Sequence, residues 1–276
     1  MMKKTKPIAC LSLITILLST SFSYANFDKK TIYDKVECIQ LPLFKSKHSS
    51  INNVFTIEMK KIDENKEFFK SDIHYPNLKI KNKYLDDENS NIEFIENINK
   101  EIFNYINDFK NKIEEESKEY EKQYKTIFSK AKDQYVKYQY EAYSDYQVTY
   151  NKNNLISIPI KLYEFTGGAH GMSHLKSFNY DLENKKELKL KDLFKENVNY
   201  KKIVNKFIND EISKNKDIYF TREEGFKGIS DNQSFYIDNE GIVVYFGLYE
   251  IAPYYVGIPK FKLTWDDFEK YLQYNK

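Results

Sequence analysis

Cysteine is nearly absent from this chain of 276 residues, which contains only Cys10 and Cys38. Cys10 lies inside an apolar N-terminal run with the features of a secretion signal, so Cys38 is the one cysteine expected in the exported protein. A single cysteine cannot form an internal disulfide, although Cys38 can still pair with another chain. The exported protein must therefore be stabilised by its hydrophobic core, and its roughly 250 residues are enough for one large domain or two modest ones.

Arginine is also scarce, since Arg222 is the only one, and no excess of positive charge compensates for it. The formal net charge is +2, and it becomes −1 when the three lysines of the N-terminal segment are removed. A protein without a basic field is not expected to bind nucleic acid. Glu223 and Glu224 directly follow Arg222, so we expect this arginine in a surface ion pair rather than in a ligand site.

Long apolar runs are missing, apart from the one between Ile8 and Leu18. Three lysines precede this run, and Ser23-Tyr24-Ala25 places small residues at the two positions that a signal peptidase reads. The run is about half as long as the ~20 residues that span a bilayer, so we expect residues 1–25 to be a signal peptide and the exported protein to carry no permanent membrane anchor. The sequence leaves open whether this segment is cleaved or is retained as an anchor.

Glycine is rare as well, and three of the eight glycines fall within five residues, at Gly167, Gly168 and Gly171. Glycine adopts positive φ angles without a Cβ penalty and leaves room for a close approach of the backbone. A cluster of glycines after a strand-like segment therefore predicts a tight turn or a bulge. His170 lies inside the cluster, where we expect its ring nitrogens to bind loop carbonyls and hold the turn.

Tyrosine, by contrast, is abundant, and one dense segment runs from Tyr249 through Tyr254 to Tyr255. Pro253 restricts the backbone of this segment and Glu250 adds one carboxylate. Tyrosine rings provide broad contact area at low entropic cost, which is typical of recognition surfaces, but such rings equally fill the core beside a sheet. The sequence leaves both interpretations open for these five residues.

The remaining sequence predicts an α+β fold of antiparallel, tyrosine-rich sheets packed against a few helices. Apolar residues at helical spacing predict one long helix from Ser90 to about Ser129. A change of phase in the alternation of the next strand predicts a bulge near Tyr143. The expected strands are 31–43, 54–62, 134–150, 155–165, 175–182, 235–237, 242–246 and one that contains Phe261, and the other expected helices are 200–218 and a C-terminal one capped by Thr264.

Residue patterns that carry catalysis or bind a cofactor are not found in the sequence. His170 and His174 are four residues apart, but along a strand this spacing separates two side chains by about 13 Å, too far for one metal ion. The sequence contains no Gly-x-Ser-x-Gly hydrolase block and no nucleotide-binding glycine loop. We therefore expect no catalytic residue, no cofactor and no metal site.

Four blocks of sequence form a familiar combination: 73–78 followed by Asn97-Ile98-Asn99, then 166–171, 178–194 and 249–257. Together they resemble the extracellular module of RsiV-type anti-sigma factors, a pair of domains of unknown function. The first of these domains also occurs in the non-catalytic part of PdaC-type peptidoglycan deacetylases. The resemblance implies two sequential subdomains, over residues 26–170 and 171–276. It does not imply deacetylase activity, because the Thr-Phe-Asp-Asp motif of the catalytic deacetylase domain is absent here.

RsiV-type modules bind host lysozyme, so the resemblance implies lysozyme or a cell-wall component as the partner. It makes Gly167, Gly168, His170 and the segment 249–255 the first candidates for contact. Only a short basic segment precedes the apolar run, so we do not expect this chain to hold a sigma factor. We expect a secreted or wall-associated binding module that is not an enzyme. A peptidoglycan-acting enzyme and a structural envelope or spore-associated protein remain as alternatives.

Overall fold

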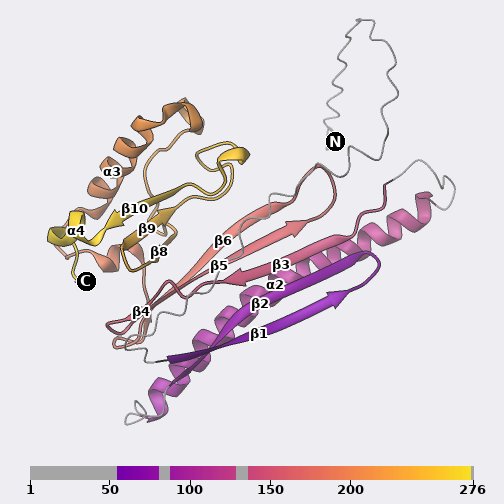
Figure 1. Cartoon of the computed structure of the whole chain (residues 1–276), viewed down its shortest axis with the longest axis horizontal. Coiled ribbons are helices and arrows are strands. Elements are labelled where there is room, and N and C mark those ends of the chain that lie inside the picture. Colours follow the sequence, from indigo (N-terminus) through magenta and orange to yellow (C-terminus); the bar gives the residue numbers. More distant parts are fainter. Residues whose placement is uncertain (1–54, 81–87, 129–135, 275–276) are drawn as a thin grey trace, which may run out of the picture. The chain divides into compact units, whose positions relative to one another are not determined.

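The computed structural model describes residues 55–80, 88–128 and 136–274 (Figure 1). The predicted signal peptide, Cys38 and the predicted strand 31–43 lie outside the described residues. The described chain has the expected α+β content, with helices and two separate sheets. Within it, no helix combines the length and the apolar character needed to cross a bilayer.

The first sheet has seven strands and begins with the hairpin of β1 (Phe55–Asn65) and β2 (Phe69–Ile80). Its other strands are β3 (Tyr140–Tyr146), β4 (Tyr150–Lys152), β5 (Leu155–Phe165), β6 (Met172–Asp181) and β7 (Lys186–Glu187). The order is β1-β2-β3-β5-β6-β7, with β4 paired to β5. β2 and β3 are parallel and so differ from the antiparallel pattern that was predicted. Parallel neighbours need a long crossover, and the helix α2 (Glu88–Phe128) lies in the connection between them.

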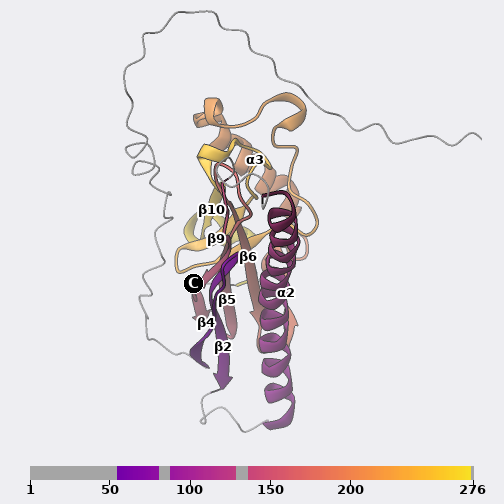
Figure 2. The same ribbon diagram turned by 90° about the vertical axis from the view of Figure 1, so that its right-hand side faces the viewer.

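The helix α2 runs along the first sheet, and its length confirms the predicted single helix (Figure 2). Its buried residues recur every three or four positions, which places them on one face of a helix. They are Ile95, Ile98, Ile102, Ile106 and Ile113, each at most 5% exposed. Tyr105 also follows Ile102 at helical spacing, but it is 37% exposed, and Ile106 continues the row of isoleucines into the core.

Asn99 of α2 holds the free edge of β2 beyond the end of its pairing with β3. Its Oδ1 accepts the N–H of Leu78 at 2.8 Å, and its Nδ2 donates to the carbonyl of the same residue at 3.0 Å. The amide side chain therefore replaces a neighbouring strand at this position. This contact gives the Asn97-Ile98-Asn99 block a structural role.

We expect Asn99→Ala to lower the free energy of unfolding by about 1–3 kcal/mol, because both backbone groups of the buried Leu78 lose their partner. Urea unfolding followed by circular dichroism measures the change. Asn97→Ala is the matched control, since Asn97 is exposed on the same helix, and its effect should stay within about 0.5 kcal/mol. Equal losses in the two variants would contradict this role of Asn99.

The predicted bulge exists, but not at Tyr143. β3 pairs with β5 in an unbroken register through Tyr143 and up to Tyr146, which lies opposite Ile160. Pairing resumes with Tyr150 opposite Ser157, so the register shifts by one residue after Tyr146. The extra residue therefore lies between β3 and β4, and this position corrects the prediction.

The second sheet has three strands in the order β10 (Lys260–Thr264), β9 (Gly241–Tyr245) and β8 (Phe235–Ile237). Buried apolar side chains from this sheet, from α3 (Tyr200–Lys214) and from α4 (Trp265–Phe268) form one hydrophobic cluster. The short 3-10 helices are η2 (Leu190–Leu193), η3 (Lys216–Ile218), η4 (Arg222–Glu224), η5 (Tyr254–Val256) and η6 (Glu269–Tyr271). Thr264 caps α4 as predicted, with its Oγ1 accepting the N–H of Asp267 at 3.2 Å.

The central strand β5 is buried on both faces. Ile156, Ile158 and Ile160 join the apolar cluster that contains the α2 isoleucines. Between them, the hydroxyl of the buried Ser157 donates to Asn179 Oδ1 at 2.6 Å and accepts the N–H of Ile237 in β8 at 2.9 Å. The predicted division at residues 170 and 171 falls in the loop between β5 and β6, and β6 and β7 continue the first sheet beyond it.

Candidate protein-binding site

The two sequence blocks named as candidates for partner contact meet in the structure. The first block, residues 166–171, connects β5 to β6, and we call it the glycine loop. The second block, residues 249–257, lies between β9 and β10, and we call it the tyrosine loop. The hydroxyl of Tyr254 donates to the carbonyl of Gly171 at 2.9 Å, across 83 positions of sequence. The rings of His170 and Tyr254 stack with centroids 4.2 Å apart and an interplanar angle of 25°. The candidate residues therefore belong to one surface.

The glycines of the glycine loop are required for two physical reasons. Gly167 and Gly168 have φ angles of 93° and 94°, which side chains with a Cβ rarely adopt. A Cβ on Gly171 would lie 2.4 Å from the carbonyl oxygen of Glu164 and 2.5 Å from the ring of Tyr163, so no side chain fits there. The prediction of a tight loop is confirmed by these angles and distances.

His170 makes the contact expected of a residue that holds the turn. Its Nδ1 lies 3.0 Å from the carbonyl oxygen of Gly171, and because that oxygen only accepts, Nδ1 carries the proton. The same carbonyl accepts the hydroxyl of Tyr254, so it joins the two loops at one atom.

The tyrosine loop combines a buried anchor with exposed rings. Ile251 and Ala252 are buried at 4% and 0% exposure, whereas Tyr249 and Tyr255 are 48% and 72% exposed. Tyr254 is half-buried, and its ring lies 5.7 Å from that of Tyr249. The rings of His170, Tyr254 and Tyr249, with the neighbouring Tyr255, form what we call the aromatic ridge.

Backbone geometry also determines the shape of the tyrosine loop. Tyr249 adopts a φ of 63°, and Pro253, at φ −68°, precedes the 3-10 turn η5. Glu250 closes the first part of the loop, with its Oε2 accepting the N–H of Gly247 at 2.7 Å. Pro253 and Glu250 therefore shape the loop, while the exposed tyrosines are free to contact a partner.

An acidic hollow of about 560 Å³ adjoins the aromatic ridge at Tyr249 and Glu250. Its lining contains two further carboxylates, Glu223 and Glu224, three phenylalanines and one cation, Lys227, so that three acidic side chains face one basic side chain. Among the described residues, none forms an ion pair with these three glutamates, and the predicted ion pair of Arg222 is likewise not found there. Aromatic walls beside unpaired carboxylates suit a cationic side chain.

His174, which follows the glycine loop, makes a separate contact. His174 lies on β6, and its Nε2 is 3.2 Å from Glu164 Oε1. This hydrogen bond lowers the pKa of Glu164 against the opposing effect of burial. His170 and His174 thus bind different groups.

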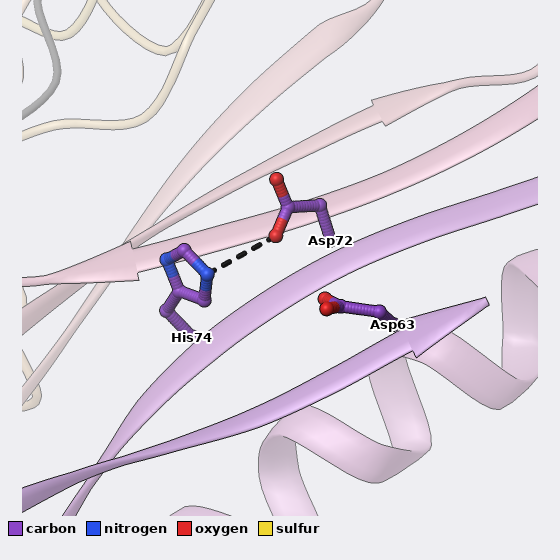
Figure 3. A group of neighbouring side chains, drawn as sticks. All are labelled: Asp63, Asp72 and His74. Atoms are coloured by element: carbon purple, nitrogen blue, oxygen red, sulfur yellow. Dashed lines mark ion pairs between the residues drawn. The ribbon is translucent and has the colours of Figure 1, made fainter.

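A different cluster can offer metal ligands, and it was missed at the sequence level. Asp63, Asp72 and His74 each place one ligand atom within 4.8 Å of the others, and in the described part of the chain this is the one such group (Figure 3). The available signal was Asp72 and His74 at strand spacing in the second half of a hairpin. It became meaningful only once the register placed Asp63 opposite Asp72.

Family models match both parts of the described chain. Residues 62–173 match the model of the deacetylase PdaC, and residues 191–266 match that of DUF3298, a protein family of unknown function. A crystal structure of a DUF3298 member from Bacteroides fragilis has 23% sequence identity and a TM-score of 0.54. The match covers 81% of this chain and 96% of the other, and it supports a shared fold alone.

Two curated proteins of Bacillus subtilis strain 168 are similar to this chain. The peptidoglycan-N-acetylmuramic acid deacetylase PdaC is 33% identical over 117 residues, which cover 41% of this chain and 25% of the deacetylase. The anti-sigma-V factor RsiV is 32% identical over 174 residues, which cover 60% of this chain and 58% of RsiV. The chain therefore spans a quarter of one relative and less than two thirds of the other. The matches to the two family models and to these two proteins confirm the predicted resemblance to the RsiV-type module that shares a domain with PdaC.

Proposed function

We propose that this chain is a secreted binding module of the RsiV type and that its partner is lysozyme. The observation that carries the proposal is the meeting of the glycine and tyrosine loops in one exposed aromatic ridge. The match to PdaC covers only a quarter of that deacetylase, so we assign the chain a role in binding rather than in catalysis.

The chemistry of the surface fits such a partner. Interface hot spots are enriched in tyrosine, and Tyr249 and Tyr255 present large rings from a loop that is anchored in the core. The acidic hollow beside them adds carboxylates that attract basic side chains.

The direct test is calorimetric titration of hen lysozyme into the chain from Asn26 onward, with a lysozyme activity assay in the same buffer. Binding at micromolar affinity or better supports a lysozyme sensor or inhibitor. Loss of lysozyme activity in the complex would indicate that the ridge covers the catalytic cleft of the enzyme. Absence of binding would contradict the proposal and leave a cell-wall polymer or another protein as the partner.

Tyr255→Ala is expected to weaken the lysozyme complex by about tenfold or more, because this ring is 72% exposed and central to the proposed contact. Its exposure also means that truncation should leave the fold intact, which the thermal unfolding midpoint checks. Met59→Ala is the control, since Met59 is 59% exposed on β1 and lies outside the aromatic ridge. If both variants bind like the wild type, the ridge is not the contact surface.

A further inference from the structure

The hairpin of β1 and β2 places three metal-ligating side chains together. Asp63 pairs directly with Asp72 in the antiparallel register, so their side chains share one face of the sheet. His74 is two residues beyond Asp72 and points to the same face. Figure 3 shows the three side chains directed toward one another. Two carboxylates directly opposite each other repel, so this arrangement calls for a positive charge between them.

Two of the facing atoms are close together but make no hydrogen bond with each other. Asp72 Oδ1 and His74 Nε2 are 3.1 Å apart, yet they are not aligned for a hydrogen bond, and both atoms are shielded from solvent. Ligand atoms bound to one metal ion at about 2.0–2.2 Å, with angles of about 90–110° between the bonds, lie roughly 2.8–3.6 Å from one another. The Asp72 and His74 separation falls in this range, and Asp63 needs only a small side-chain movement to complete the set.

Lys61 supplies the positive charge in this structure, but it leaves His74 Nε2 without a hydrogen bond. Its Nζ lies 2.6 Å from Asp63 Oδ2 and 3.6 Å from Asp72 Oδ1, while His74 Nε2 receives no hydrogen bond. The Lys61 side chain is 49% exposed and is able to turn away into solvent. A metal ion can therefore replace the ammonium group without disturbing the backbone.

We propose that Asp63, Asp72 and His74 bind a divalent transition-metal ion of the zinc class, with water at the remaining positions. An imidazole ligand favours zinc and similar ions, whereas Mg²⁺ and Ca²⁺ prefer sites built only from oxygen atoms. The site cross-links β1, which is an edge strand of the first sheet, to β2. Its position on the hairpin makes it independent of the aromatic ridge.

Calorimetric titration of zinc chloride into the chain from Asn26 onward, without a histidine tag, tests the site. We expect one zinc ion per chain and a higher unfolding midpoint with zinc than with Mg²⁺ or Ca²⁺. His74→Ala and Asp72→Asn should each weaken zinc binding by about tenfold or more. His174→Ala is the matched control, because His174 also faces one carboxylate, Glu164, and forms no ion pair with a second one among the described residues.

Lys61→Met separates a metal site from a simple ion-pair cluster. If zinc displaces the ammonium group, the variant binds zinc more tightly than the wild type, and its circular dichroism spectrum is unchanged. Absence of zinc binding in both proteins overturns the proposal. It is also overturned if His74→Ala binds zinc as well as the wild type, since the metal would then lie elsewhere, for example at Cys38.

Discussion

Lys110→Met is expected to lower the free energy of unfolding by about 3 kcal/mol. The Lys110 side chain is only 7% exposed, and its Nζ lies 2.5 Å from Glu64 Oε1 and 2.9 Å from Glu114 Oε2. The methionine keeps the volume but leaves Glu64 with Lys66 alone and Glu114 with Lys66 and Lys118, two lysines that are 54% and 51% exposed. Because Glu64 lies on β1 and Glu114 on α2, the loss weakens the attachment of the hairpin to the helix.

Urea unfolding at neutral pH measures this loss. Lys112→Met is the matched control, since Lys112 lies on the same helix, is 62% exposed and reaches its nearest carboxylates only at 3.7 and 3.9 Å. Surface pairs of this kind contribute about 0–1 kcal/mol. A Lys110→Met variant as stable as the control would mean that desolvation cancels the attraction within the cluster.

The same cluster predicts a specific loss of stability in acid. Hydrogen bonds from Lys66 and Lys110 lower the pKa of Glu114 from 4.5 to about 2. A carboxyl group with a lowered pKa in the folded state stabilises the protein above its unfolded pKa, and this contribution disappears as the pH falls toward 2. Glu114→Gln should therefore reduce stability at pH 7 by up to about 3 kcal/mol, and the difference from wild type should vanish near pH 2. A difference that does not change with pH would exclude this linkage.

Gly171→Ala should destabilise the protein by about 3 kcal/mol and abolish partner binding at the aromatic ridge. The new methyl group would lie 2.4 Å from the backbone oxygen of Glu164, which cannot rotate away as a flexible side chain would. The loop must then move, and the Gly171 carbonyl, which binds both His170 and Tyr254, moves with it. Thermal unfolding and the lysozyme titration measure the two effects.

Gly168→Ala is the informative comparison, because Gly168 has open space around its Cα but a φ of 94°. Backbone strain alone should lower the free energy of unfolding of Gly168→Ala by about 1–2 kcal/mol, and the contact between the two loops should be retained. If Gly171→Ala and Gly168→Ala have the same unfolding midpoint and the same affinity for lysozyme, the close packing at Gly171 does not organise the aromatic ridge.

Local patterns were sufficient to predict most helices and turns of the described chain. The isoleucines of α2 predicted its face and length because residues three and four apart are neighbours on any helix. Asn153 and Asn154 are residues typical of turns, and in the turn between β4 and β5 they adopt φ angles of 52° and 58°, which asparagine tolerates. Asp181 stabilises another turn, where its Oδ1 accepts the N–H of Glu183 and Asn184.

The candidate site was predicted residue by residue, but its geometry was not. Composition and resemblance named His170 and the tyrosine segment, yet no local pattern indicates that the ring of His170 stacks on that of Tyr254. The division of the tyrosine loop into buried Ile251 and exposed Tyr255 likewise depends on which side the core occupies.

The amino-acid order alone thus determined the helical face of α2, the glycine turn and the residue types of the aromatic ridge, because these depend on neighbours in the chain. The parallel pairing of β2 with β3, the place of the bulge and the grouping of Asp63, Asp72 and His74 were decided by the tertiary structure. Strand register depends on which face of a strand is buried, because a shift of one residue would turn every side chain to the opposite face. Side chains that are far apart in the sequence come into contact only when the strands have paired in this register.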